Sequence, residues 1–337
     1  MDACLYEMIN AHQSNKTKFR LSEYWKKLNE KNIMQLKDSG YENFKQTVGR
    51  NYFIWLDGIR NYKVKFLIRN LPIIHVLLAF MRALLSKKHP YLPAKQCRAY
   101  NFVTFMLWEY VIRQGAENIA SCLEEPLEGN PPYVKLKKKR ISQDLAFSML
   151  EFLEISKGVK SPSKINTIVE LGAGYGRTAF VFLTLMPDIR YIIADVPPAL
   201  YISQRYLTSQ FLSRKIFKFR DFKDYSEVAS EFQESQIAFL LPHQLELLPD
   251  KTVDLFLAID SLHEMPLEQI EYYFSIVDRL VKDFFYFKCW KETVIPHDNI
   301  KLTEKDYPVR DHWDKIFWQE CKVLTLFFEA FIRIKKV

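Results

Sequence analysis

Residues 167–180 read TIVELGAGYGRTAF, an apolar stretch that ends in an acid, breaks into three glycines and then resumes helix-forming residues. The acid is Glu170, and the glycines are Gly172, Gly174 and Gly176. The chain has only nine glycines in 337 residues and none after Gly176, so the cluster does not reflect a glycine-rich composition. A glycine turn between a strand and a helix lets a ligand approach the backbone closely. The stretch therefore predicts a ligand-binding turn after the first strand of a sheet.

The sequence around this turn predicts a doubly wound α/β fold. From about residue 141, short apolar strands alternate with helical segments. We expect strands at 165–171, 191–196, 237–241, 253–259 and 284–289, and near 317–325 and 328–334. This order predicts a Rossmann-like, mostly parallel sheet with helices on both faces. The ligand crevice of such a sheet lies beyond the carboxyl ends of its strands, where the strand order reverses.

The N-terminal part has a different pattern. Its first 125 residues repeat apolar positions at helical spacing, which predicts a helical accessory domain (1–125) that covers the substrate. A turn-rich basic connector (126–140) and a ligand-binding domain with the glycine turn (141–337) follow. The most apolar segment is Leu71–Leu85. The lysines after it suit a membrane-surface helix, but its apolar residues nearly encircle the helix, which favours burial between domains.

Composition narrows the class of protein. No apolar run is long enough to span a bilayer and the N-terminus lacks the form of a signal peptide, so we expect a cytoplasmic protein, with the inner face of the membrane as a secondary alternative. The five cysteines form no CxxC pair, which argues against a disulfide framework or a zinc site. The net charge of +8 fits an anionic partner without choosing among nucleic acid, membrane surface and phosphorylated substrate.

The acid and the glycine spacing indicate the ligand. The spacing is G-x-G-x-G rather than the dinucleotide pattern G-x-G-x-x-G, and Glu170 would repel a pyrophosphate. Glu170 instead suits a ligand with an ammonium group and no phosphates, such as S-adenosylmethionine. Asp195, nineteen residues after Gly176, ends the next strand and can accept both hydroxyls of a ribose. A dinucleotide site and a vestigial site are the alternatives.

Residues 141–337 resemble the class I S-adenosylmethionine-dependent methyltransferases. That family assigns the acid and glycines to the methionine moiety and the second acid to the ribose, which here implies Glu170, the three glycines and Asp195. More narrowly, the chain resembles the sugar O-methyltransferases of bacterial surface-polysaccharide gene clusters. This likeness extends to SEYWKKL, GYENFKQTVGRNYF, EGNPPYVKLKKKRISQDL with Glu151 following, LPHQLELLP, DSLHEM and DYPVRDHWDKIFWQECKVLTLFFEAF. It implies a sugar or glycan acceptor.

The strand at 253–259 leads to the expected chemistry. It is followed by DSLHEM, residues 260–265, which places polar groups beside the cofactor methyl. We expect Asp260 to contact the cofactor and His263 to act as general base, because neutral imidazole is available at physiological pH. Glu264 would orient His263 or bind sugar hydroxyls. The alternative is that His263 and Glu264 only open the next helix or pack at the domain interface.

Two glutamines extend the predicted cofactor site. Gln244 follows the third strand, where it can bind adenine or serve only as a loop residue. Gln143, with Asp144, heads the helix before the glycine turn and can close over the cofactor or cap the helix. No metal is expected, because four tail residues that could ligate one lack the spacing of a site: His297, Asp298, His312 and Asp314.

The tetrapeptide Asn130-Pro131-Pro132-Tyr133 matches the one with which DNA amino-methyltransferases hold a flipped base. Here the acidic, turn-forming SCLEEPLEG precedes it, where that motif should follow a buried strand. The context therefore argues against a nucleic-acid substrate. We expect a sugar O-methyltransferase, with a nucleic-acid methyltransferase and a non-catalytic cofactor-binding protein as alternatives. The sequence leaves the acceptor sugar and the oligomeric state open.

Overall fold

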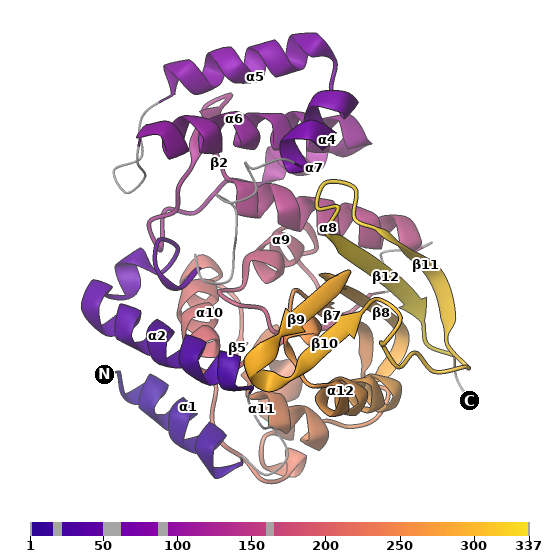
Figure 1. The fold of residues 1–337 in the computed structure, drawn as a ribbon. Coiled ribbons are helices and arrows are strands. Elements are labelled where there is room, and N and C mark those ends of the chain that lie inside the picture. The colour runs from indigo at the N-terminus through magenta and orange to yellow at the C-terminus, as the bar shows by residue number, and fades with distance from the viewer. Residues whose placement is uncertain (1, 16–21, 50–61, 87–93, 160–164, 336–337) are drawn as a thin grey trace.

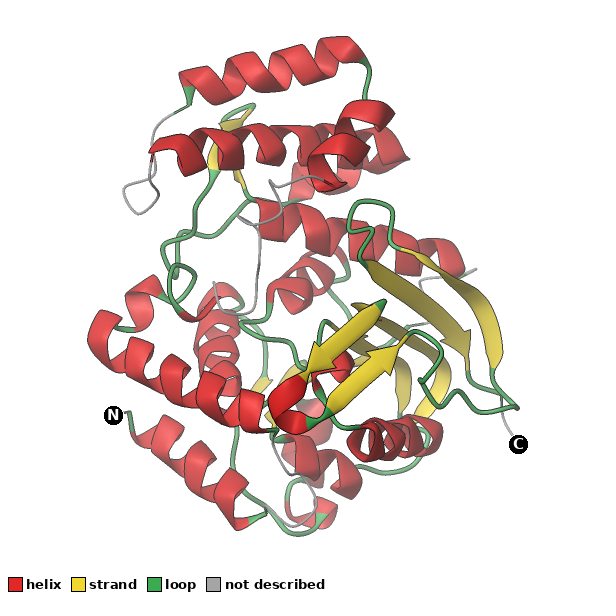
Figure 2. Cartoon of the chain, in the orientation of Figure 1, coloured by secondary structure: helices red, strands yellow, loops and turns green. Residues whose placement is uncertain are grey.

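An eight-stranded sheet forms the centre of the molecule (Figures 1 and 2). The computed structural model describes residues 2–15, 22–49, 62–86, 94–159 and 165–335. The strand order is β11-β12-β8-β7-β3-β4-β6-β5. The strands are β3 (Thr167–Leu171), β4 (Arg190–Ala194), β5 (Ile216–Phe217), β6 (Ile237–Leu240), β7 (Val253–Ile259), β8 (Val281–Trp290), β11 (Asp314–Glu320) and β12 (Phe327–Arg333). Strands β3 to β8 pair in parallel, and β12 is antiparallel to both β8 and β11.

This topology confirms the predicted Rossmann-like sheet. The chain runs outward from β3 to β4 and β6, and then crosses back to place β7 on the other side of β3. The strand order therefore reverses at β3, directly before the glycine turn. Side chains alternate between two apolar cores, one on each face of the sheet. One face packs against α8 (Gln143–Gly158), α9 (Arg177–Leu185) and α10 (Pro197–Gln210), and the other against α11 (Ala229–Glu234) and α12 (Leu267–Leu280).

The predicted N-terminal helical segment is confirmed, and its helices form two groups (Figure 1). The first group, α1 (Ala3–Ser14) and α2 (Glu23–Ser39), packs against α10. The second contains α4 (Tyr62–Asn70), α5 (Ile73–Leu85), α6 (Ala94–Val111) and α7 (Glu117–Cys122), and it meets the sheet domain where α6 packs on α8. Division into domains at residues 125 and 140 stays a prediction.

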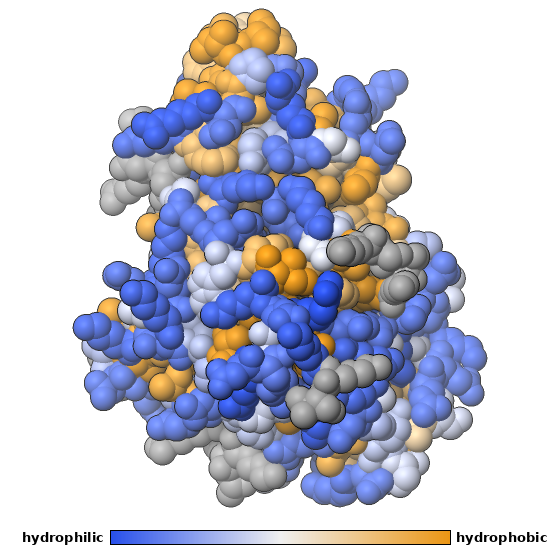
Figure 3. Space-filling model, turned by 90° about the vertical axis from the view of Figure 1, so that its right-hand side faces the viewer, coloured by the Kyte–Doolittle hydropathy of each residue, from blue (hydrophilic) through white to orange (hydrophobic). Residues whose placement is uncertain are grey.

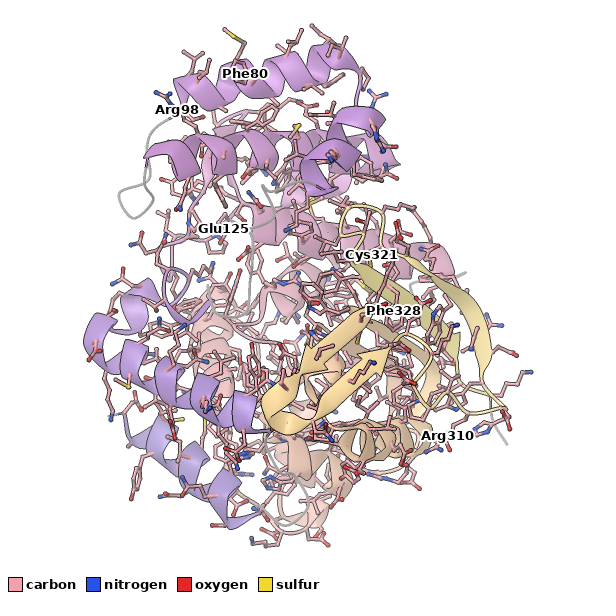
Figure 4. All side chains as sticks on the ribbon, viewed as in Figure 1. Phe80, Arg98, Glu125, Arg310, Cys321 and Phe328 are labelled. Atoms are coloured by element: carbon pink, nitrogen blue, oxygen red, sulfur yellow. The ribbon has the colours of Figure 1, made fainter. Side chains whose placement is uncertain are left out.

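Glu125 lies between the upper helices and the sheet domain (Figure 4). Its carboxylate is buried and accepts hydrogen bonds from Lys45 Nζ at 2.6 Å and from the Ser142 hydroxyl at 2.5 Å. Ser142 is also the N-cap of α8, since its Oγ accepts from the Leu145 amide. One buried carboxylate thus ties the segment after α2 to the start of the sheet domain.

Two short hairpins were not predicted. In the basic connector, β1 (Val134–Leu136) and β2 (Lys139–Ile141) are joined by Lys137 and Lys138, both at positive φ. Near the C-terminus, β9 (Glu292–Ile295) pairs with β10 (Ile300–Thr303). Each strand has only three or four residues and is partly exposed, so its sequence carries no clear alternation.

The expected burial of Leu71–Leu85 is wrong. Within α5 only Ala79 and Ala83 are buried, whereas Leu85 is 83% exposed and Ile73 is 70% exposed. The reason is that α6 packs against one side of α5, while the opposite side forms an apolar outer surface at the top of the molecule (Figure 3).

Candidate functional site

A cavity of about 1030 Å³, including its open mouth, lies at the carboxyl ends of β3, β4 and β7. The sheet contributes residues 170–174, 194–196 and 259–261 to its lining. The start of α12 and the turn before it contribute Glu264, Met265, Gln269 and Tyr273. The crevice predicted from the strand order is therefore present, and it contains Glu170, Gly172, Gly174, Asp195, Asp260 and Glu264 from the predicted set.

The glycine turn brings the ends of three strands together. Gly172 has φ +77°, and its amide donates to the Ala194 carbonyl at 2.9 Å. A Cβ at Gly172 would lie 2.5 Å from Cβ of Ser261, so a larger residue here would collide with the end of β7. Gly176 does not line the cavity. It begins α9 at φ +88°, and a Cβ there would lie 2.9 Å from Cδ1 of Leu207.

We expect Gly172→Ala to destabilise the protein by more than the roughly 1–2 kcal/mol that left-handed backbone costs an alanine. The additional loss comes from the collision with Ser261. Gly115→Ala is the matched control, because Gly115 has φ +83° and a Cβ added there would meet no atom within 4 Å. Urea unfolding of both variants measures the difference, and equal losses would contradict the close packing at Gly172.

Glu170 and Asp195 are both buried beside the turn. Glu170 accepts a hydrogen bond from the Tyr191 hydroxyl at 2.7 Å. Asp195 accepts from the Gly174 amide at 2.8 Å and from the Val196 amide at 2.7 Å. Burial raises the pKa of Glu170 to about 7 and that of Asp195 to about 7. Since desolvation of the charged form is the cause, a cation in the cavity would favour ionisation of both carboxyls.

Two further acids, Asp260 and Glu264, line the cavity. Asp260 follows β7 at φ +58°, and its Oδ1 is buried without a hydrogen-bond partner among the described residues. Burial raises its pKa. Burial and the neighbouring Asp260 raise the pKa of Glu264 to about 8, although the Trp25 side chain donates a hydrogen bond to it. A strained backbone and an unsatisfied carboxylate oxygen at a cavity wall indicate a ligand contact.

His263 does not line the cavity, which contradicts its predicted contact with an acceptor. Its ring is buried, with centroids 6.3 Å from Trp290 and 6.4 Å from Phe327. Burial lowers its pKa to about 3. The closest approach to Glu264, 3.9 Å between Nε2 and Oε1, is too long for a hydrogen bond. The short 3-10 turn Leu262–Glu264 directs these neighbours differently, so that only Glu264 reaches the cavity.

Neither predicted glutamine lines the cavity. Gln244 is buried, accepts from the Leu241 amide at 2.9 Å and donates to the Arg220 carbonyl at 3.0 Å, so it stabilises its own turn. Gln143 is also buried and donates to the Tyr100 carbonyl of α6 at 3.3 Å. Both side-chain amides bind backbone groups and do not face the cavity. Neither glutamine is therefore placed to contact a cofactor there, contrary to the prediction from the sequence.

The remaining candidates whose side chains the structure describes also lie outside the cavity. Asn130 donates to the Asn43 side chain at 2.9 Å, and the Pro132 carbonyl accepts from Tyr100, so the Asn-Pro-Pro-Tyr segment is held as a structural connector. His312 pairs with Asp278 at 2.8 Å. The side chain of His297 is outside the described residues. Across the described part of the chain, no three His, Cys, Asp or Glu side chains converge as a metal site would require.

A buried ionic network supports the glycine turn. Arg177, the first residue of α9, pairs with both carboxylate oxygens of Glu151 on α8, at 2.7 and 3.0 Å. Lys288 of β8 donates to the same carboxylate at 2.9 Å. Burial opposes ionisation of Glu151, but the charges of Arg177 and Lys288 outweigh it and lower the pKa of Glu151 to about 2. The sequence motif showed the place of Arg177 directly after the turn, but not its partners.

The sequence predicted a covering role for the N-terminal helical region as a whole, but not that α1 and α2 are the helices that line the cavity. They contribute His12, Ser22, Trp25 and Leu28 to its lining. The Asp298 carboxylate, between β9 and β10, accepts from the first two amides of α2, Glu23 at 2.5 Å and Tyr24 at 3.0 Å. The C-terminal hairpin thereby holds the start of α2 over the site. The segment SEYWKKL, which contains Ser22 and Trp25, was the only sequence signal for this cover.

Comparison with known proteins gives a distant structural likeness only. No family model and no curated protein matches the sequence. Among solved structures, the chain is similar to the PH0226 protein of Pyrococcus horikoshii, at 15% identity and a TM-score of 0.39, with 56% of this chain and 91% of that chain covered. A SAM-dependent methyltransferase of Aquifex aeolicus matches at 16% identity, a TM-score of 0.34 and coverage of 55% and 89%.

A third similar structure is magnesium protoporphyrin IX methyltransferase of Synechocystis with bound SAH, at 11% identity. Its TM-score is 0.39, and the match covers 67% of this chain and 97% of that chain. Such similarities are too low to transfer a substrate or a residue role. The function of this chain therefore has to come from its own residues.

Proposed function

We propose that this protein is an S-adenosylmethionine-dependent O-methyltransferase whose acceptor is a sugar hydroxyl. The observation that carries the proposal is the charge of the cavity. Four carboxyl groups line it, from Glu170, Asp195, Asp260 and Glu264. The one Lys or Arg among the described lining residues is Arg177, which already pairs with Glu151.

This charge distribution favours S-adenosylmethionine over a dinucleotide as the cofactor. A dinucleotide would bring the negative pyrophosphate towards buried acids, which is unfavourable at low effective dielectric. S-adenosylmethionine brings a sulfonium and an ammonium group instead. Glu170 and Gly174 would lie near its methionine part, Asp195 would accept from its ribose, and the unpaired Oδ1 of Asp260 would accept from its ammonium group. The close packing at Gly172 keeps the turn narrow beside the ligand.

Glu264 is our candidate general base. When bound, S-adenosylmethionine supplies an electrophilic methyl group. The methyl group would pass to the acceptor oxygen, with the sulfur as leaving group, and Glu264 would take the hydroxyl proton. Its raised pKa makes it a stronger base than an ordinary carboxylate, and the Trp25 hydrogen bond orients it. The cover formed by α1 and α2 would exclude water from the transfer.

The sugar acceptor is supported by the sequence resemblance, and the decisive experiment is a comparison of acceptors. Labelled methyl groups from the cofactor should enter nucleotide-sugar, lipid-linked glycan or polysaccharide fractions and not DNA. Incorporation into DNA would overturn the sugar assignment and leave methyl transfer intact. Incorporation into no fraction, with the cofactor bound, would favour a non-catalytic binding protein.

Asp195→Ala is expected to remove most of the thermal stabilisation that S-adenosylmethionine gives. A ligand present at a hundred times its dissociation constant stabilises a protein by about 2.7 kcal/mol, and that increment should shrink when the ribose contact is lost. Each variant is compared with its own ligand-free Tm, which removes any intrinsic destabilisation. Asp188→Ala, at an exposed position, is the control. An equal increment in Asp195→Ala, or none in the unmutated protein at millimolar cofactor, would overturn the cofactor assignment.

A further inference from the structure

The outer face of α5 is apolar throughout. Its eight most exposed residues are Ile73, Ile74, Leu77, Leu78, Phe80, Met81, Leu84 and Leu85, each between 40% and 83% exposed. At 3.6 residues per turn these positions occupy one continuous arc of about 160°. No polar residue falls within that arc. Exposed apolar residues scattered singly are ordinary, but a continuous face of this size indicates an interaction surface.

Polar residues mark only the edge of this face. His75 and Arg82 lie on its border, and both pair with Glu109 of α6, at 3.0 and 2.7 Å. The contacts with α6 hold α5 at the outer end of the molecule (Figures 1 and 3). Phe80 lies on the outer helix, and Arg98 near the start of the helix beneath it (Figure 4). The face is therefore presented outward on a packed helix pair.

The helical group to which α5 belongs, from α4 to α7, carries almost all of the net charge of the chain. Residues 62–122 contain nine Lys and Arg residues and two Glu residues, a net charge of +7, against +8 for the whole chain. Exposed cations of this part include Lys65 and Arg69 on α4 and Arg98 on α6. An apolar helix face within a strongly basic group of helices is the pattern of a surface that lies in the interface of an anionic bilayer.

We propose that α5 docks this protein on the surface of a membrane that contains anionic lipids, with the apolar arc inserted at the headgroup boundary. Across the described residues no helix is long and apolar enough to cross a bilayer, so the contact is interfacial. A second copy of the chain is the less favourable occupant, because a symmetric contact through α5 would bring two segments of charge +7 together.

Flotation of the full-length protein with lipid vesicles tests the proposal. Vesicles of phosphatidylcholine with 30% phosphatidylglycerol should bind the protein, and pure phosphatidylcholine vesicles should bind it at least tenfold less. Raising the salt from 0.05 to 0.5 M should weaken binding, because screening shortens the reach of the cations. The triple variant Lys65→Gln/Arg69→Gln/Arg98→Gln should lose about fivefold in partitioning for each removed charge that faces the bilayer.

A matched pair of double variants tests how much the apolar arc of α5 contributes to vesicle binding. Leu77→Gln/Met81→Gln alters residues 53% and 54% exposed on the arc and should abolish flotation. Leu127→Gln/Leu212→Gln alters residues 56% and 83% exposed elsewhere and should not. Light scattering measures the mass of the protein in solution and so shows whether it forms a dimer. Equal binding by the two double variants would overturn the proposal, as would absence of vesicle binding, and a dimer dissolved by Leu77→Gln/Met81→Gln would assign the face to a second copy.

Discussion

Replacing Glu264 with glutamine is expected to lower kcat by about 10²–10⁴-fold, the usual contribution of a general base. An amide keeps the size of the side chain and its place beside Trp25, but it cannot accept the proton of the acceptor hydroxyl. Cofactor binding should persist, because the cofactor contacts proposed for Glu170, Asp195 and Asp260 do not involve the Glu264 side chain. Steady-state kinetics with the identified acceptor and a thermal shift with S-adenosylmethionine measure the two quantities separately.

Glu268→Gln is the matched control, since Glu268 is exposed on α12, four residues from Glu264, and does not line the cavity. It should retain the unmutated rate. The pH profile gives a second readout. Because the raised pKa of Glu264 is about 8 and only the ionised form is a base, kcat/KM should rise tenfold per pH unit below about 8 and level above it. An unchanged rate in Glu264→Gln would contradict the assignment.

Glu151→Gln is expected to destabilise the fold by about 3–5 kcal/mol, the cost of breaking a buried ionic pair from one side. The substitution leaves the buried cations Arg177 and Lys288 without their shared carboxylate. Since Arg177 opens α9 directly after the glycine turn, the cavity beside the turn should loosen as well. Chemical unfolding at pH 7 measures the stability loss.

Glu154→Gln separates this effect from loss of an ordinary surface pair. Glu154 is on the same helix, more exposed, and pairs with Lys157 and Lys322, so we expect a loss below about 1 kcal/mol. The pH dependence follows from the lowered pKa of Glu151. Its stabilisation is full above the ordinary carboxyl pKa and disappears as the pH falls towards about 2. That decline should be smaller in Glu151→Gln, and equal losses in the two variants would contradict the network.

Much of the site was predictable because it depends on the chain order of the strands. Glu170, Gly172, Gly174, Asp195 and Asp260 all lie at or just after the ends of parallel strands, and such ends meet at one edge of a sheet. The predictions that the structure contradicts fall on turns and helix starts. Gln143 and Gln244 lie near the correct edge of the sheet, but both satisfy backbone groups there.

The sequence by itself determined the sheet, the glycine turn and the acidic character of the cavity, because alternating and helical periodicities and strand ends are local features. Only the tertiary structure decided that Glu264, and not His263, faces the cavity, because neighbouring residues of a 3-10 turn point in different directions. It also decided that Trp25 covers the site and that α5 is exposed. Both depend on which helices pack together across long sequence separations, and local periodicity carries no information about that.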